Sequence, residues 1–329
     1  AFQSGNIEAL PGAPEIDEQL IQNCTHIVAM MGHEPIVNLL KEKCDVVLCG
    51  RASDTALFSA LPLMRGFLPG PVWHCAKTIE CGAICSTSTR ADGVFAEIDD
   101  NGFSVEPLAL DASCTPLSLA SHTLYENADP YLIREPSGML DTQNARYQKL
   151  SERKTRVEGS VFRPDRYTLK LEGATCTGFQ TVAIGGVRDP YIIARVDSWL
   201  AEMKVFFAER LKELTGKTLG KEVRLDISQY GKNAVMGELE KSSAQIPNEI
   251  GLLLRVTAAE DALANAVARF ITPTASLWPI PGWYGRSSGI AFPFSPPEID
   301  RGPVYGFTLN HVLIPESPLS AFRFEMENI

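Results

Sequence analysis

Residues 45–54, Asp-Val-Val-Leu-Cys-Gly-Arg-Ala-Ser-Asp, are the stretch on which the predicted fold depends. Residues 46–49 are all apolar, which is typical of a strand that is buried on both faces of a parallel sheet. Gly50 ends this strand, and the Ser-Asp pair that follows is suited to cap a helix that stops at Pro62. The stretch therefore predicts a strand, a tight turn and a helix in succession.

The flanking residues repeat this alternation of strand and helix. An apolar run at residues 25–31 predicts a strand, and the spacing of apolar residues predicts helices over 36–43 and 71–86. Strands that alternate with helices are typical of a parallel, Rossmann-like layer. A hairpin with an Asn-Gly turn is expected over 93–110.

The second half of the chain predicts a different arrangement. Its expected elements follow the order β-α-β-β-α-β, which matches a ferredoxin-like sandwich. They are strands over 178–184, 222–228, 249–257 and 304–313, a long helix over 191–214 that ends at Gly216, and a helix over 258–270. We therefore predict a Rossmann-like α/β domain over residues 1–155 and an α+β ferredoxin-like domain over residues 156–329. The chain begins Ala1-Phe2-Gln3, without an initiator Met, and we expect upstream strands to complete the first domain.

Composition and charge exclude several classes of protein. The 329 residues include 30 Lys and Arg against 40 Asp and Glu, a net charge of -10, so the chain lacks the basic surface of a nucleic-acid-binding protein. No apolar stretch approaches the roughly 20 residues that span a bilayer. The eight cysteines occur partly in apolar runs, which favours reduced, buried thiols. We expect a cytoplasmic protein, with an organellar targeting segment before residue 1 as an open alternative.

The first candidate site lies where the strand at 46–49 turns into a helix. Open α/β sheets bind ligands at the carboxyl ends of their strands, and the free N–H groups of a helix start attract anions. Arg51 is suited to clamp a carboxylate or phosphate, together with Ser53, Asp54 and Thr55. A purely structural interpretation, in which the helix is only capped here and Arg51 forms a surface ion pair, is equally simple.

The second candidate site lies on the helix predicted over 71–86. His74 and Lys77 share a face of this helix, and Glu80 lies one turn after Lys77. These side chains are suited to proton transfer, and burial can tune their pKa values. The alternative is a surface Lys–Glu pair beside buried cysteines. No cofactor is predicted, and a divalent metal held by carboxylates, which leaves no spacing pattern, stays open.

Two loops carry further candidates. Arg134, Glu135 and Ser137 lie in a Pro- and Gly-containing turn after a predicted strand, where rigid polar groups can face a pocket. Tyr230 and Lys232 follow a strand of the second domain and are suited to act as an acid or to hold an anion. Ordinary turns and solvated loops explain both segments without function.

Several sequence strings, in order along nearly the whole chain, together resemble the acyclic terpene utilisation family. They include IVAMMG (27–32), GRASDTAL (50–57), WHCAK (73–77), ECGA (80–83), REP (134–136), LDT (140–142), KLEGA (170–174), RDP (188–190), YGKNAVMG (230–237) and AFPFSP (291–296). The resemblance implies a role in the breakdown of citronellol- and geraniol-type compounds, alongside acyl-CoA enzymes. It carries over no catalytic set. It also implies a glycine-rich region before the part matched, and residues 302–325 resemble a small companion domain of the family.

The preferred hypothesis is a lyase-like enzyme, such as a hydratase or dehydratase, that transfers protons on a carboxylate or CoA-thioester substrate. The expected catalytic residues are Lys77, Glu80, His74 and Glu135. The expected substrate-binding residues are Arg51, Ser53, Asp54, Thr55, Arg134, Ser137, Tyr230 and Lys232. The alternatives are a non-catalytic subunit or scaffold of an acyl-metabolising complex, and a hydrolase with Cys81 or Ser137 as nucleophile. The expected partners are an anionic small molecule and further copies of the chain, with a small companion subunit as an option, and neither nucleic acid nor a membrane.

Overall fold

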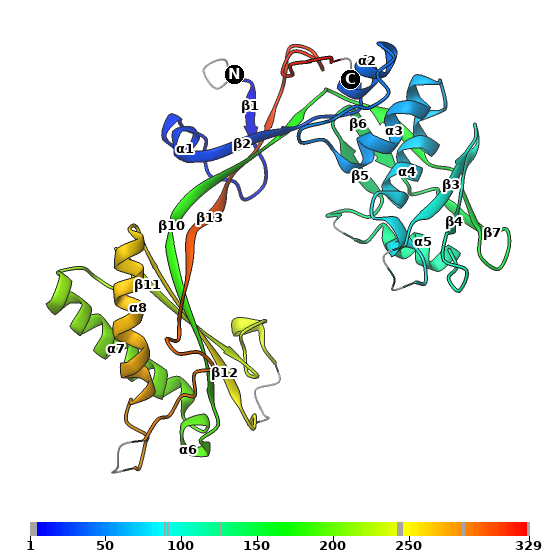
Figure 1. Ribbon diagram of the computed structural model, residues 1–329. Helices are drawn as coiled ribbons and strands as arrows, with labels where there is room; N and C mark the ends of the chain where they lie inside the picture. The colour runs from blue at the N-terminus through cyan, green and yellow to red at the C-terminus, as the bar shows by residue number, and fades with distance from the viewer. Residues whose placement is uncertain are drawn as a thin grey trace. The chain divides into compact units, whose positions relative to one another are not determined.

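The computed structural model describes residues 5–88, 90, 92–125, 127–241, 246–283 and 287–327 (Figure 1). The chain divides into two compact units. One contains Ala1–Ala174 and Phe307–Ile329, and the other contains Thr175–Gly306. The long strands β10 (Leu169–Val187) and β13 (Glu298–Leu313) contribute residues to both units. Within the described ranges, no helix combines the length and the apolar character that crossing a membrane requires.

The first unit contains two small antiparallel sheets, with strand orders β3-β4-β8-β7 and β5-β6-β9. The strands of the first sheet are β3 (Val94–Ile98), β4 (Gly102–Pro107), β7 (Arg146–Lys149) and β8 (Thr155–Glu158). Those of the second are β5 (Leu132–Glu135), β6 (Gly138–Asp141) and β9 (Val161–Pro164). The hairpin predicted over 93–110 is confirmed, since Ile98 pairs with Phe103 and the Asp99 carboxylate accepts a hydrogen bond from the Asn101 N–H at 2.9 Å.

Two further strands and five α-helices complete the first unit. Strand β1 (Ile7–Ala9) pairs with β13, and β2 (Cys24–Met30) pairs with β10. The helices are α1 (Glu18–Asn23), α2 (Glu34–Lys41), α3 (Asp54–Met64), α4 (Pro69–Ile79) and α5 (Pro116–His122), and a 3-10 turn, η1, covers Gly82–Cys85. Helix α3 continues through Pro62, which removes one hydrogen bond from its last turn without ending it.

The prediction of a Rossmann-like parallel sheet is wrong. The named sheets are antiparallel, and residues 45–50 form no strand. Val46 and Leu48 are 82% and 95% exposed, whereas Val47 and Cys49 pack against the buried cluster of Ile36, Ala56 and Ala60. The apolar run is therefore covered on one side only, and not on both as expected. A single parallel bridge joins Met31 to Ala52. An apolar run shows that a segment can be buried in a sheet, but it does not specify neighbouring strands or their direction.

Helix α4 is the central element of the first unit, and most of its residues are buried. Trp73 stacks on Phe162 of β9, with ring centroids 5.3 Å apart. At the start of α4, Gly70 lies directly on the backbone of the same sheet, since a Cβ at this position would lie 2.3 Å from the Ser160 carbonyl oxygen. This close packing fixes the helix that carries His74 and Lys77.

Replacing Gly70 with Ala is expected to destabilise the protein by about 1–3 kcal/mol, because the added methyl group meets backbone that must shift. The free energy of unfolding in urea measures this loss. Gly186→Ala is the matched control, since its Cβ would meet nothing within 4 Å. Equal stabilities of the two variants would show that α4 moves away from β9 without loss.

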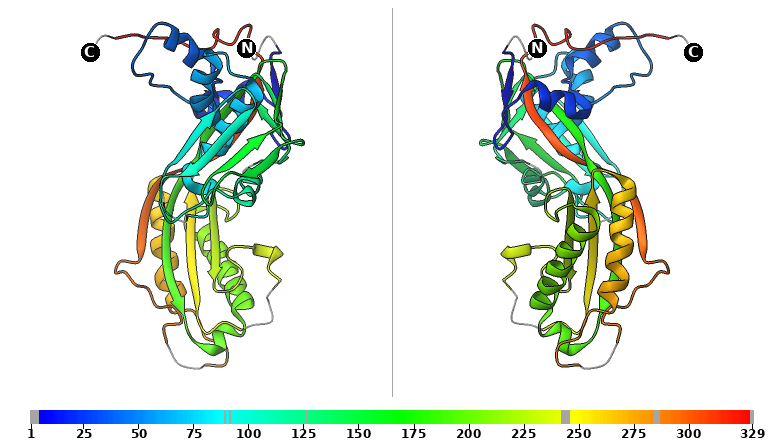
Figure 2. Two further views of the ribbon diagram at one scale, coloured as in Figure 1. Left: turned by 90° about the vertical axis from the view of Figure 1, so that its right-hand side faces the viewer. Right: turned by 90° about the vertical axis from the view of Figure 1, so that its left-hand side faces the viewer.

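The second unit builds a single core on one sheet, with strand order β13-β10-β12-β11. Figure 2 shows α7 and α8 on the same face of this sheet. The elements after β10 are α6 (Pro190–Ile193), α7 (Val196–Thr215), β11 (Val223–Tyr230), the 3-10 turn η2 (Gly237–Leu239), β12 (Ile250–Ala258) and α8 (Asp261–Ser276). The order β-α-β-β-α-β agrees with the prediction, and α7 ends at Gly216, whose φ of 71° is left-handed.

Candidate active site

A cavity of about 540 Å³ lies in the first unit, which is a volume suited to a small molecule. Its wall combines apolar residues with eight ionisable side chains. The ionisable residues are Arg51, Asp54, Lys77, Glu80, Asp129, Arg134, Glu135 and Lys170. The remaining lining residues are Leu10, Met30, Ser53, Thr55, Asn127, Ala128, Leu132, Ile133, Pro136, Thr168 and Val312. Residues predicted separately on α3, α4 and β5 therefore meet at one cavity.

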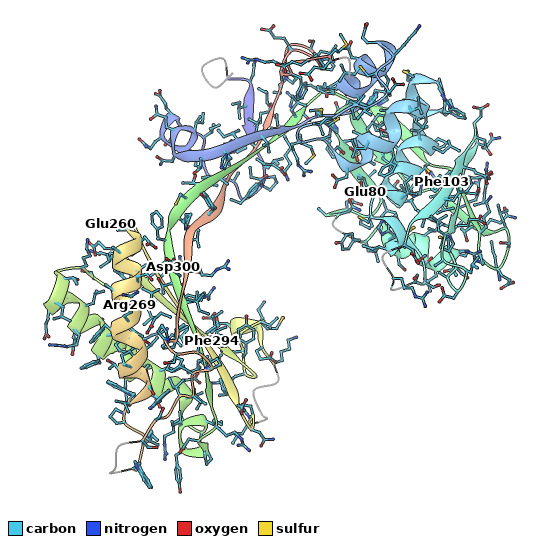
Figure 3. All side chains as sticks on the ribbon, in the orientation of Figure 1. Glu80, Phe103, Glu260, Arg269, Phe294 and Asp300 are labelled. Atoms are coloured by element: carbon cyan, nitrogen blue, oxygen red, sulfur yellow. The ribbon has the colours of Figure 1, made fainter. Side chains whose placement is uncertain are left out.

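The end of α4 supplies a close Lys–Glu pair to the cavity. Lys77 lies in the last turn and Glu80 is the C-cap residue, labelled in Figure 3. The Lys77 Nζ donates to the Glu80 Oε1 at 2.5 Å, and the two side chains are only 17% and 7% exposed. The structural alternative of a surface pair therefore does not apply, since both groups are largely removed from water.

Burial and pairing act in opposite directions on the pKa of Lys77. Burial alone acts to lower it, but the hydrogen bond from Lys77 to Glu80 and the charges of Glu80 and Glu135 outweigh burial and raise it. Burial raises the pKa of Glu80, and the hydrogen bond from Lys77 only partly opposes this. Both groups therefore hold a proton to higher pH than they would in water.

Glu135, at the end of β5, forms the second part of the site. Its side chain is buried, with a residue exposure of 5%. The Ser53 hydroxyl donates to its Oε2 at 2.9 Å, and the Thr55 hydroxyl donates to its Oε1 at 2.7 Å. Burial raises the pKa of Glu135 to about 7, although both hydroxyl hydrogen bonds and the charge of Lys77 act to lower it.

The two hydroxyl groups around Glu135 also lie close to each other. Ser53 Oγ and Thr55 Oγ1 are 3.0 Å apart, and each donates to one oxygen of the carboxyl group. Both oxygens of Glu135 are therefore held by hydroxyl donors, whose hydrogen bonds act to lower the pKa of Glu135 and only partly oppose the effect of burial.

Thr55 connects the two parts of the site. Its hydroxyl, which contacts Glu135, also interacts with the carboxyl group of Glu80. Lys77, Glu80, Thr55 and Glu135 thus form a continuous polar chain along one wall of the cavity. Thr55 lies in the first turn of α3, where Ser53 is the N-cap residue but its side chain makes no capping hydrogen bond. The Ser53 hydroxyl donates to Glu135 instead.

Charged side chains of several elements complete the wall. Arg51 contacts Asp54 at 3.5 Å and Glu172 at 3.0 Å, so it is held by carboxylates on two sides. Arg134 pairs with Asp165 at 2.6 Å, and both are about half exposed. Guanidinium groups of this kind are suited to bind a carboxylate or phosphate.

The structure places His74 outside this cavity. It is fully buried in α4, where its Nδ1 lies 2.5 Å from the Ser160 hydroxyl and its Nε2 lies 3.4 Å from the Tyr147 hydroxyl. Its ring also contacts Phe103 edge-on, which Figure 3 labels in the same unit. Burial lowers the pKa of His74 to about 4. It is a neutral core residue rather than part of the cavity wall.

Three other candidates also lie outside the cavity wall. Ser137 follows Glu135 in the turn between β5 and β6, and among the described residues its buried hydroxyl has no hydrogen-bond partner. Tyr230 and Lys232 belong to the second unit, where Lys232 pairs with Asp197. None of these three residues is among the described residues that line the cavity.

Sequence reasoning missed the contributions of β10 and of the loop after α5. Lys170 and Thr168 line the cavity, and Asp129 approaches it from the loop. Lys170 and Glu172 are two positions apart in a strand, so they lie on the same face of it. This period-2 spacing was the available signal that the two side chains meet. Arg51, the partner of Glu172, is 121 residues away from it in sequence, and no local spacing predicts such a contact.

The described residues contain no group of three or more His, Cys, Asp or Glu side chains arranged to hold a metal ion. Two of the cavity carboxyl groups already have other partners. Glu80 is paired with Lys77, and Glu135 accepts hydrogen bonds from Ser53 and Thr55.

The fold and cavity define a two-unit α/β protein whose first unit has a cavity lined by ionisable groups. The family model described as "Acyclic terpene utilisation family protein AtuA" matches residues 7–288, most of the chain. The chain therefore belongs to the acyclic terpene utilisation family, which confirms the resemblance found in its sequence strings. Comparisons with curated proteins and with solved structures give no match.

Proposed function

We propose that this protein is an enzyme that transfers protons on a small carboxylate or acyl-thioester substrate, as a hydratase, dehydratase or related lyase does. The observation that carries the proposal is the buried polar chain of Lys77, Glu80, Thr55 and Glu135 on the wall of one cavity. Clusters of buried ionisable groups with shifted pKa values are typical of catalytic sites. The family's role in acyclic terpene utilisation supports a branched or terpenoid substrate.

Glu135 is the best placed general acid and base in this proposal. A group with a pKa near the working pH is both protonated and deprotonated in useful amounts, and the pKa of Glu135 is about 7. Thr55 and Ser53 hold its oxygens in place. Lys77 is positively charged and lies on the same wall, so it is suited to stabilise negative charge that develops on a substrate oxygen.

Arg51 and Arg134 are the proposed contacts for the anionic group of the substrate. Both line the cavity, and both have exposed side chains that a ligand can reach. A guanidinium group binds a carboxylate or phosphate through two parallel hydrogen bonds. This separates the binding of the anion, at the rim, from the proton transfer at the buried carboxyl group.

A hydrolase that uses Ser137 or Cys81 has less support. Neither residue is among the described residues that line the cavity. A nucleophilic hydroxyl requires a base within hydrogen-bond reach, and the Ser137 hydroxyl has no such partner among the described residues. We therefore prefer proton transfer to nucleophilic catalysis.

Replacing Lys77 with Met tests the proposal. The protein is incubated in D₂O with branched, unsaturated acyl-CoA thioesters and the corresponding carboxylates. Mass spectrometry then measures deuterium gained next to the carboxyl or thioester group and water gained across the double bond. We expect the wild type to process at least one of these substrates, and Lys77→Met to lower its turnover about 10²-fold or more.

Lys149→Met is the matched control for this experiment. Lys149 forms a Lys–Glu pair of the same i,i+3 spacing with Glu152, but both of these side chains are more than half exposed. Lys149 lies outside the cavity wall, so the turnover of Lys149→Met should equal that of the wild type. Equal turnover by Lys77→Met and Lys149→Met would contradict the proposed function.

A further inference from the structure

Glu172 lies behind the cavity wall and binds two of the cations that form it. Its Oε2 accepts a hydrogen bond from the Arg51 Nε at 3.0 Å, and its Oε1 pairs with the Lys170 Nζ at 2.9 Å. The Glu172 side chain is only 18% exposed. Each carboxylate oxygen therefore serves one cation, and neither cation competes with the other for the same atom.

Both cations line the cavity, whereas Glu172 is not among its lining residues. Arg51 uses its Nη1 to bind the Ala52 carbonyl oxygen at 3.2 Å and Asp54 at 3.5 Å, and no described residue accepts a hydrogen bond from its Nη2. Lys170 also lies 5.9 Å from the centre of the Phe307 ring. An ammonium group has three donors and a guanidinium group has five, so both cations keep donors for a ligand.

We propose that Glu172 is a positioning residue that fixes Arg51 and Lys170 as a paired-cation site for an oxyanion of the ligand, a carboxylate or a phosphate. The proposal rests on the proposed function, since it assigns the anionic group of that substrate to a defined part of the cavity wall. The sequence analysis predicted neither Lys170 nor Glu172 as a catalytic or substrate-binding residue.

Preorganisation is the physical reason for such a residue. Free Arg and Lys side chains each lose considerable rotamer freedom when they are fixed on a ligand, and this weakens binding. The contacts with Glu172 already restrict both side chains in the free protein. Burial acts to raise the pKa of Glu172, but the hydrogen bonds from Lys170 and Arg51 outweigh it and lower the pKa, so the carboxylate stays charged at neutral pH.

Glu172→Gln separates positioning from charge. This variant removes one negative charge next to two cations, and by charge alone it would bind anions more tightly. Gln has one acceptor oxygen, so it is able to hold only one of the two cations. If positioning dominates, the variant binds anions more weakly in spite of the gain in positive charge.

The test measures binding of inorganic phosphate and of acetate by titration calorimetry at constant ionic strength. We expect saturable binding to the wild type and about tenfold weaker binding to Glu172→Gln, to Arg51→Gln and to Lys170→Met. Arg166→Gln is the control, since neither Arg166 nor its partner Glu8 is among the described residues that line the cavity. This variant should bind anions as the wild type does. Thermal unfolding of each variant checks that it is folded.

Tighter binding of phosphate would identify a phosphate-bearing ligand, and tighter binding of acetate a carboxylate ligand. Unchanged or tighter anion binding by Glu172→Gln would overturn the proposal, as would the absence of saturable binding by the wild type. These measurements require no turnover, so they fail or succeed independently of the Lys77 experiment. With a substrate in hand, Glu172→Gln should raise KM and leave kcat nearly unchanged.

Discussion

Glu135→Gln is expected to lower turnover by about 10²- to 10⁴-fold, the contribution that a well-placed general acid or base makes. The amide has the shape of the carboxyl group and is able to accept from one hydroxyl while it donates to the other. Ser53 and Thr55 therefore keep their hydrogen bonds at the positions of Glu135 Oε2 and Oε1. An amide cannot give up or take a proton at neutral pH, so the variant keeps the geometry and loses only the chemistry.

The pH dependence of turnover identifies the group responsible. The wild-type profile should contain a limb with an apparent pKa near 7, the value to which burial raises the pKa of Glu135. Residual activity of Glu135→Gln should lack this limb. Glu152→Gln is the control, because Glu152 is 91% exposed and pairs only with Lys149. A Glu135→Gln enzyme with the wild-type profile would mean that another group transfers the proton.

Local sequence patterns predicted local structure well. The Asn-Gly turn before β4, the long helix that ends at Gly216 and the β-α-β-β-α-β order of the second unit are all present. Each depends on residues close in sequence or on one face of a single element. The apolar run at 45–50 failed as a predictor because a parallel sheet also requires partner strands in the right positions. Next to this run the structure has a parallel bridge between Met31 and Ala52, but no parallel partner strand among the described residues.

The site was predictable as a set of residue types and less so as an assembly. Lys77 and Glu80 lie one turn apart, so their pairing followed from helical spacing. Their approach to Glu135, through Thr55, depends on the packing of α3 against α4 and β5, which no local pattern specifies. His74 shows the converse, since a residue on the same helix is directed into the core.

Two buried groups should give the free energy of unfolding opposite dependences on pH. The pKa of Glu135 rises from 4.5 in the unfolded chain to about 7 in the folded protein. Folded Glu135 therefore binds more protons between these values, and its contribution to stability is lost as the pH rises from 4.5 through 7. The pKa of His74 falls from 6.5 to about 4, so its contribution is lost as the pH falls from 6.5 through 4.

Each shift corresponds to about 3 kcal/mol at 1.36 kcal/mol for each pH unit of pKa difference. In the wild type the two effects largely cancel between about pH 4.5 and 6.5. Glu135→Gln removes the contribution of Glu135 and leaves that of His74. Relative to the wild type, it should gain about 3 kcal/mol of stability between about pH 4.5 and 7.5, and its own stability should fall in acid because of His74. Urea unfolding of both proteins across this range measures the difference.

The same substitution thus links catalysis to stability. A buried carboxyl group that is ionised near neutral pH destabilises the folded protein when its partners only partly replace water, as the raised pKa of Glu135 indicates. If Glu135 had no function, Gln at this position would make the protein more stable at neutral pH and would cost no turnover. The expected combination is higher stability and lost turnover, which is typical of a residue retained for function. If the difference in the free energy of unfolding between Glu135→Gln and the wild type is the same at both ends of the pH range, the pKa of Glu135 is an ordinary one. The assignment of its role would then be wrong.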